Sequence, residues 1–410
     1  MALRVCTGAF KTSPIESIYV DSGFPPLAIR REEQGLRYVS RALTSQSNPN
    51  YKYIRNPADR APTKPTLPKP LEVRLGNSAR EVGLIPPPIM EITPSKFPPW
   101  CRPPIRKCKI RDNKRNSTSI QLKSNFLAHA SEHSSSIAVF TDGSKTADGV
   151  GCSVVIGARV VEKSLDSKFS VFNAEIYAIY SCLKIIYTTG SAGDSFIIHC
   201  DSQSTLAALE KFISSNPLVQ EVQDWLVLLH RKQIEIKFCW VPSHVGIRGN
   251  ELADAAAKRA ASSPGSCNLK VPSQDFKLFI KSFIKIKWQD QWSNLNSNFK
   301  LKSIRPSVQP WPHFGLERRS SIILTRLRIG HTFLTHRYLL TSGAERLVPQ
   351  CSRCNVDITV KHIFIDCPRY FNSRRKFGLN NKPLSDILGV DAPIEEILKF
   401  LKDINLFYDI

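Results

Sequence analysis

The chain has 410 residues, 42% of them hydrophobic and 22% charged, so it can build packed domains and is not wholly disordered. No apolar run approaches the ~20 residues of a membrane span, and the first residues do not resemble a secretory signal, so we expect no membrane partner. The net charge is +22, divided as +12 over residues 1–136, −1 over 137–262 and +11 over 263–410. Two basic flanks around a near-neutral centre favour a polyanion, such as nucleic acid, as the partner of the flanks.

Residues 1–56 are predicted to be helical. A helix start at Ser13-Pro14 is followed by a break at Gly23–Pro26 and by an amphipathic stretch from Leu27 to Leu43. Residues 57–134 are interpreted as a basic linker, because residues 57–104 hold 13 of the 28 prolines, which disfavours a long helix or a central strand. The basic run at 102–123 fits a solvated tail or a nucleic-acid contact equally well.

Residues 135–263 alternate between strand and helix patterns. Three strand patterns come first, and the order is β-β-β-α-β-α-α-β-α, which predicts an α/β domain with a mixed sheet. The expected elements are strands over 136–144, 149–156 and 158–165, a helix over 173–188, a strand over 195–202, helices over 202–213 and 216–232, a strand over 234–244 and a helix over 250–262.

The remaining chain divides into a basic helical region at 264–345 and a cysteine-containing region with short helices at 346–410. Trp288 and Trp292 lie one turn apart on a predicted helix, where core packing is favoured over stacking on bases. The spacing Cys351-x2-Cys354-x7-His362-x4-Cys367 predicts one structural Zn²⁺ with a Cys₃His ligand set, the alternative being thiols that are merely buried. Cys101 and Cys108 have no evident partner pair and are left unassigned.

Four carboxylates in the central domain form a pattern. Asp142 and Asp201 follow apolar strands, while Glu175 and Asp254 lie near helix starts. Each alone fits an ordinary turn or a favourable helix-dipole position. Together they can meet at one edge of the sheet, where their repulsion would need compensation by divalent cations such as Mg²⁺. Two such ions can support the in-line hydrolysis of a phosphodiester.

The segments TDGSK, NAEIYAI, CDSQSTL and WVPSHVGIRGNELADAAAK resemble the four catalytic blocks of the ribonuclease H family, in the family's order. The resemblance implies a mixed five-stranded sheet with flanking helices and endonucleolytic cleavage of the RNA strand of RNA–DNA hybrids. It also implies that the four carboxylates hold two Mg²⁺ (or Mn²⁺) ions and that His244 assists proton transfer or product release. Asn173 and Gln203 match positions that contact the hybrid. The segment between Asp201 and His244 is compact and has few basic residues, so we expect the basic substrate-gripping protrusion of some bacterial members to be absent.

The Cys-Cys-His-Cys spacing and the preceding ILTRLRIGHTFLTHRYLL resemble an element that follows ribonuclease H in some non-LTR retrotransposon polyproteins. Residues 1–45 resemble the last segment of the reverse transcriptase region of Jockey-like elements, without the polymerase motifs. This resemblance implies template RNA, target DNA and the polymerase part of the same polyprotein as partners. Two alternatives stay open: a catalytically weak fragment that binds nucleic acid through its basic flanks and zinc element, and a domesticated host protein. An intracellular location is expected, with nucleus and cytoplasm both open.

Overall fold

The computed structural model describes residues 2–56, 70–84, 89–93, 95–108, 110, 118–263, 269–295, 299–340 and 347–410. The chain forms two compact units, one of Gln34–Lys281 and one that combines Met1–Glu33 with Ser282–Ile410. Two helices, α3 (Leu27–Ala42) and α11 (Ser273–Asn294), run across this division. The five-segment division predicted from the sequence stays a prediction. None of the described helices combines the length and the apolar character that crossing a membrane requires.

The Gln34–Lys281 unit is built on one mixed sheet in the order β1-β6-β5-β2-β3-β4. Strands β2, β3 and β4 form an antiparallel meander, and β5, β6 and β1 continue the sheet from β2 as parallel neighbours. The strands are β1 (Arg106–Cys108), β2 (Ile137–Lys145), β3 (Val150–Ile156), β4 (Arg159–Leu165), β5 (Ser195–Cys200) and β6 (Glu235–Trp240). This confirms the predicted α/β class and the predicted element order of the centre.

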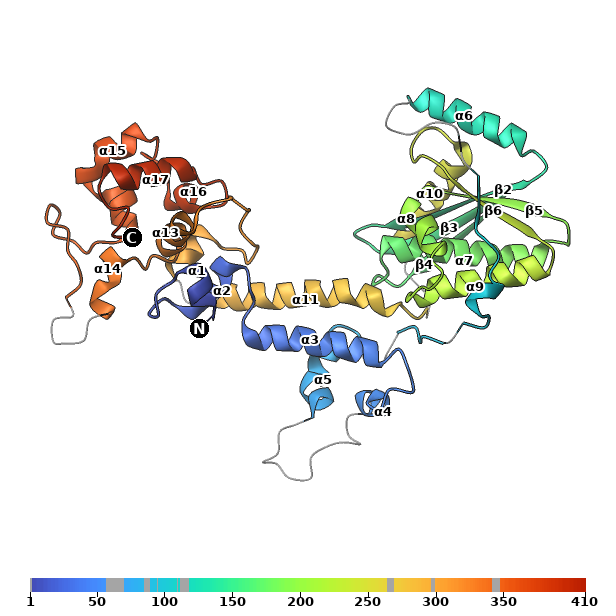
Figure 1. The fold of residues 1–410 in the computed structure, drawn as a ribbon, viewed down its shortest axis with the longest axis horizontal. Coiled ribbons are helices and arrows are strands. Elements are labelled where there is room, and N and C mark those ends of the chain that lie inside the picture. Colours follow the sequence, from blue (N-terminus) through green and yellow to red (C-terminus); the bar gives the residue numbers. More distant parts are fainter. Residues whose placement is uncertain are drawn as a thin grey trace. The chain divides into compact units, whose positions relative to one another are not determined.

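Helices cover both faces of this sheet (Figure 1). The Cβ position of Gly143 in β2 faces the backbone of α7 (Val171–Thr189), whereas Gly151 in β3 faces the backbone of α10 (Arg248–Ser262). Gly151 pairs with Ser144, one residue beyond Gly143, so α7 and α10 lie on opposite faces. Helix α9 (Pro217–Arg231) packs beside α7, and α8 (Gln203–Leu209) follows β5. The alanine-rich face of α10 permits this close approach to β3.

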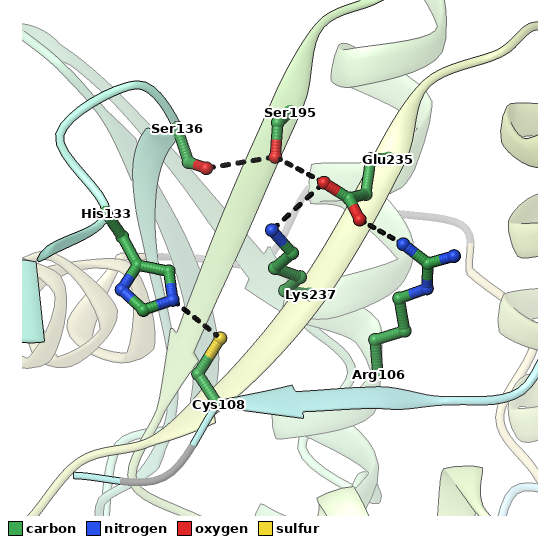
Figure 2. A network of polar contacts seen from close by, with 7 residues as sticks. All are labelled: Arg106, Cys108, His133, Ser136, Ser195, Glu235 and Lys237. Atoms are coloured by element: carbon green, nitrogen blue, oxygen red, sulfur yellow. Dashed lines mark hydrogen bonds and ion pairs between the residues drawn. The ribbon is translucent and has the colours of Figure 1, made fainter.

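Two expectations for residues 57–134 are corrected. The sheet has a sixth strand, β1, whose register with β6 pairs Arg106 with Lys237 and Cys108 with Cys239. Residues 71–81 form helix α5 (Leu71–Glu81), which is possible because no proline lies between Pro70 and Pro86. Part of the basic run also bonds to the domain: Arg106 and Lys237 both bind the Glu235 carboxylate (Figure 2), and Lys107 Nζ lies 2.6 Å from Glu210 Oε1. The other elements of this unit are α4 (Tyr51–Arg55), a 3₁₀ turn at Pro99–Cys101 and α6 (Ser119–Glu132).

The second unit is helical. Its N-terminal and C-terminal segments meet at buried Asp21, whose carboxylate accepts hydrogen bonds from Thr325 Oγ1 at 2.8 Å and Trp311 Nε1 at 3.1 Å. Trp288 and Trp292 are buried, which confirms the core interpretation. Its elements are α1 (Ala2–Thr7), α2 (Ile15–Ser22), α12 (Lys300–Ile304), α13 (Arg318–Ile329), α14 (Phe333–His336), 3₁₀ turns at Arg337–Leu339 and Pro368–Tyr370, a π-helical turn at His362–Asp366, α15 (Phe371–Lys376), α16 (Leu384–Leu388) and α17 (Ile394–Asp403).

Candidate active site

Asp142 lies inside β2, not after it. The antiparallel ladder with β3 continues to Lys145, and Asp142 is opposite Ser153 in that ladder. Asp142 is only 6% exposed, and it lies one residue beyond Thr141, the last residue of β2 that pairs with β5. The carboxylate is therefore held on a rigid strand and is largely withdrawn from water.

Gly143 brings Glu175 against the same strand. A Cβ atom at Gly143 would lie 2.4 Å from the backbone nitrogen of Glu175 and 2.7 Å from the carbonyl carbon of Ala174. Only glycine permits this contact between β2 and the second turn of α7. Helix α7 is fixed at its start by Ser170, whose side chain accepts a hydrogen bond from Asn173 N. The buried Glu175 carboxylate is thus placed beside Asp142 by a strand–helix contact.

Asp201 follows the last residue of β5. Its backbone carbonyl accepts a 3.0 Å hydrogen bond from Trp240 Nε1 at the end of β6. The Asn250 side chain, at the start of α10, hydrogen-bonds to the Asp201 carboxyl group. Burial raises the pKa of Asp201, and this hydrogen bond partly offsets that rise. Asn250 is buried, so this contact is an internal one that holds the Asp201 side chain in place.

The three carboxylates converge. Asp142, Glu175 and Asp201 each offer an oxygen atom, and these atoms lie within 4.8 Å of one another. Burial, followed by repulsion from Asp201 and Asp254, raises the pKa of Asp142 from 3.8 to about 7. Burial, with repulsion from Asp142 and Asp201, raises the pKa of Glu175 well above its ordinary value. The pKa of Asp201 is also raised, chiefly by burial. The group therefore binds protons unless another positive charge replaces them.

Asp254 lies beside this group without joining it. Helix α10 is tied to β3 by the Ser153 hydroxyl, which donates to the Ala253 carbonyl at 2.7 Å. The negative charge of Asp254 raises the pKa of both Asp142 and Asp201, so it is close enough to act on them. Its Oδ2 accepts a 2.8 Å hydrogen bond from Lys258 Nζ in the next turn. The predicted set of four carboxylates is therefore three in mutual contact and one adjacent to them.

These residues fit a hard divalent cation. Mg²⁺ and Mn²⁺ take oxygen ligands and are readily held by carboxylates. The three oxygen donors converge in a poorly solvated place, and their pKa values are raised first by burial and then by mutual repulsion, both of which a bound cation would offset. Asp142, Glu175 and Asp201 are the residues that would hold such an ion, and Asp254 lies beside them.

His244 occupies the loop after β6. Its backbone has φ +58°, a left-handed conformation that turns the chain sharply, and its side chain is exposed. An electrostatic interaction with His244 partly offsets the rise that burial causes in the pKa of Asp201. The imidazole therefore lies near the carboxylates. The imidazole is therefore open to solvent beside the carboxylate group.

Gln203 and Asn173, the two residues expected to contact the hybrid, differ in their exposure to solvent. Gln203 is exposed at the start of α8, directly after Asp201 and Ser202. Asn173 is 1% exposed, and both of its polar atoms have internal partners. Its Nδ2 donates to Asp275 Oδ1 at 2.8 Å, and its Oδ1 accepts from Asn216 Nδ2 at 2.7 Å. Gln203 is therefore free to meet a ligand, while Asn173 links α7 to α9 and α11 in this structure.

Sequence reasoning gave no role to Asn250 or Cys200. Asn250 stood inside the NELAD segment, but nothing in its spacing indicated a contact with Asp201. The Cys200 thiol lies 3.8 Å from Glu175 Oε2. Burial, with the charge of Glu175, raises the pKa of Cys200 well above its ordinary value, so the thiol stays protonated and donates to the carboxylate. Its position as the last residue of β5, one before Asp201, was the available signal.

The predicted cysteine cluster also forms. The ligand atoms of Cys351, Cys354, His362 and Cys367 lie within 4.8 Å of one another. Cys367 Sγ is 3.9 Å from the sulfur atoms of both Cys351 and Cys354, close to the ~3.8 Å that tetrahedral zinc with ~2.3 Å bonds would set. His362 Nε2 is buried and has no hydrogen-bond partner among the described residues. These four residues fit a structural Zn²⁺, which would satisfy that nitrogen.

The chain was compared with known proteins. The model of the RNase H family matches residues 134–262, which span β2 to α10 and contain Asp142, Glu175, Asp201, His244 and Asp254. No curated protein matches the chain. The matched segment contains five of the six strands of the mixed sheet, β2 to β6, and the whole carboxylate group. Residues 134–262 therefore form a ribonuclease H domain.

Proposed function

We propose that this chain hydrolyses the RNA strand of RNA–DNA hybrids in a reaction that depends on two Mg²⁺ or Mn²⁺ ions. The observation that carries the proposal is the convergence of the Asp142, Glu175 and Asp201 carboxylates within 4.8 Å, with Asp254 beside them. A bound divalent cation supplies charge neutralisation, a nucleophilic water and stabilisation of the leaving oxygen. The family match to residues 134–262 supports the hybrid as substrate.

The chain's own residues position the carboxylates, transfer a proton and contact the substrate. Asp142 on β2 and Glu175 on α7 are fixed by the Gly143 contact, and the Gly143 backbone amide hydrogen-bonds to both carboxyl groups. Asn250 orients Asp201. His244, exposed on its left-handed turn, moves a proton between the site and water. Gln203 is positioned to contact the hybrid, and Asn173 contacts it only if its internal bonds exchange.

The proposed setting is a non-LTR retrotransposon polyprotein. The support is the resemblance of residues 1–45 to a reverse transcriptase tail and of the Cys351–Cys367 element to its usual C-terminal companion. One structural Zn²⁺ in that element would order residues 347–370. The reverse transcriptase part of the polyprotein would supply the hybrid, with template RNA and target DNA as further ligands.

The test is cleavage of an end-labelled RNA strand in an RNA–DNA hybrid by the purified chain. RNA and DNA duplexes of the same sequence serve as controls, because the 2′-hydroxyl marks the strand that is cut. We expect RNA-strand cleavage in Mg²⁺ or Mn²⁺, none in EDTA and none by Asp142→Asn. Asp148→Asn is the matched control, because Asp148 is an exposed carboxylate in the turn between β2 and β3 and lies outside the carboxylate group.

Cleavage by Asp142→Asn at the wild-type rate would contradict the proposed site. No cleavage in either metal, with salt-sensitive binding of the hybrid retained, would instead favour the alternative of a nucleic-acid-binding fragment. That alternative predicts that Cys354→Ser lowers affinity for the hybrid while Asp142→Asn does not.

A further inference from the structure

A second cluster of cysteine and histidine side chains lies in the Gln34–Lys281 unit, outside the carboxylate site. Cys108 of β1, Cys239 of β6 and His199 of β5 occupy paired positions in three neighbouring parallel strands. Residues paired across adjacent strands point to the same face of a sheet. The two thiols and the imidazole therefore form a row across one face.

Helix α6 adds two more imidazoles to this row. His129 is buried on α6, and His133 follows the last residue of the helix, four positions later, with its ring stacked on that of His129 at a centroid separation of 4.5 Å. The ligand atoms of Cys108, His129 and His133 lie within 4.8 Å of one another, and so do those of His129, His199 and Cys239. Figure 2 shows one of these approaches, Cys108 Sγ to His133 Nε2 at 3.8 Å.

The hydrogen bonds of the imidazoles leave lone pairs directed at the cluster. His133 Nδ1 lies 3.1 Å from the His129 carbonyl, and His199 Nδ1 lies 3.2 Å from the Val139 carbonyl. A carbonyl only accepts, so Nδ1 carries the hydrogen in both rings and Nε2 carries the lone pair. Histidines that bind metals are held in this way, with the other ring nitrogen donating to a carbonyl or carboxylate.

Several of these nitrogen atoms have no partner. His199 Nε2 and both ring nitrogens of His129 are buried and have no hydrogen bond to any described residue. Buried polar atoms are paired in most proteins, and a group of unpaired ones at a single place requires an explanation. An ion bound between the thiols and the imidazoles would pair one of the two ring nitrogens of His129.

We propose that Cys108, His129, His133 and Cys239 hold one Zn²⁺ ion. Two cysteines and two histidines are a common ligand set for structural zinc, and the 3.8 Å between Cys108 Sγ and His133 Nε2 is close to the ~3.6 Å expected for two ligands of one tetrahedral ion. On binding, each thiol releases its proton to water and coordinates as a thiolate. Two thiolates balance the charge of Zn²⁺, so the complete site is neutral, as a buried site requires. His199 lines the site beside Cys239.

The ion would fasten two short elements to the sheet. Strand β1 has only three residues, and the buried side chains of α6 are Leu122, Phe126 and His129. Phe126 packs against Val241 and Ile247, which flank His244 in the loop after β6. A zinc ion that holds α6 in place therefore also supports the loop that carries His244. This metal site does not depend on the proposed nuclease activity.

Zinc content of the purified full-length chain tests the proposal. The Cys351–Cys367 element is a separate site, so each variant has a defined expected zinc content measured by mass spectrometry. We expect two zinc ions per wild-type chain, one in Cys108→Ser, one in Cys354→Ser and none in the double variant. Cys182→Ala is the matched control and keeps both ions, because Cys182 is a buried thiol of α7 outside both clusters. Wild-type zinc content in Cys108→Ser, or no zinc in Cys354→Ser, would overturn the proposal.

Cobalt substitution in the Cys354→Ser background identifies the ligands. We expect the visible bands of tetrahedral Co²⁺ and a sulfur-to-cobalt band that falls by at least half in Cys239→Ser. His133→Ala provides a second way to remove the site, and both variants should keep the far-ultraviolet dichroism of the parent. Chelation in this background should also speed amide exchange in residues 119–133. A sulfur-to-cobalt band unchanged by Cys239→Ser, or amide exchange in α6 unaffected by chelation, would contradict the assignment.

Discussion

Replacing Asp142 with asparagine should stabilise the metal-free domain while abolishing its activity. Asp142 is 6% exposed, and its pKa is raised from 3.8 to about 7 by burial and by repulsion from Asp201 and Asp254. A carboxyl group whose folded pKa lies above its unfolded pKa favours the folded state only while it is protonated. The penalty for folding is therefore absent below about pH 3.8, grows through the interval to about pH 7 and is complete above it.

The size of this effect follows from the same interval. One pKa unit corresponds to about 1.4 kcal/mol, so the ionised Asp142 side chain costs the metal-free fold up to about 4 kcal/mol at pH 8 and about 1–2 kcal/mol at pH 5. An asparagine side chain at this position would carry no charge and would avoid this cost. The Asp142→Asn variant should therefore gain stability over the wild type by about 2–3 kcal/mol more at pH 8 than at pH 5.

Hydrogen exchange of backbone amides in EDTA measures the stability of the metal-free domain around Asp142. A single thermal or denaturant transition would combine the unfolding of the two units of the chain. Peptides covering β2 and α7 should exchange more slowly in Asp142→Asn than in the wild type at pH 8, after correction for the intrinsic pH dependence of exchange. Adding Mg²⁺ should slow exchange in the wild type and have little effect in the variant. Equal exchange in the two proteins, or the same gain in Asp148→Asn, would refute the electrostatic reasoning.

Three further substitutions test the packing around the site, and a fourth tests the support of the His244 loop. Gly143→Ala should cost about 1–3 kcal/mol and abolish hybrid cleavage, because its Cβ would lie 2.4 Å from Glu175 N. Gly151→Ala, with a similar clash against α10, should lower the melting temperature but keep the response to Mg²⁺; equal Mg²⁺ responses in the two variants would contradict this. Asn250→Ala should raise the pKa of Asp201 and move the acidic limb of the pH–rate profile to higher pH, and an unshifted limb would argue against this contact. Phe126→Ala should lower kcat and speed amide exchange over 241–247; unchanged exchange there would show that α6 does not support the His244 loop.

The sequence predicted the centre of the domain well because its signals are local. Apolar strand patterns and helical spacing set the element order from β2 to α10, and the carboxylates follow directly from their places on those elements. The strand expected over 136–144 agrees with β2 within one residue at each end, because its pairing with β3 carries the strand through Asp142 to Lys145. Asp142 and Gly143, a pair that is common in turns, lie inside this antiparallel ladder opposite Ser153 and Cys152.

The errors in the 57–134 region have a different cause. Proline density averaged over 57–104 hid the proline-free stretch that forms α5. Strand β1 has three residues and owes its existence to the free edge of β6, which no local pattern reports. Cys108 lies beside Cys239 only because of that register, so the sequence alone did not indicate a partner for Cys108. His129 and His133 follow Cys108 within 25 residues and lie four residues apart, but this spacing was not recognised as part of a site.

The carboxylate site and its support depend on the same packing. Gly143 lets α7 approach β2, and this approach removes water from Asp142 and Glu175, which makes their ionised forms costly. The lost hydration that destabilises the ionised group is what makes it a strong ligand for a cation, because each carboxylate gains more from an ion in a poorly solvated site than at the surface. A more exposed arrangement would fold more easily and hold the ion less firmly. Stability of the metal-free domain and affinity for the metal should therefore change in opposite directions across substitutions that alter burial at Gly143 and Asp142.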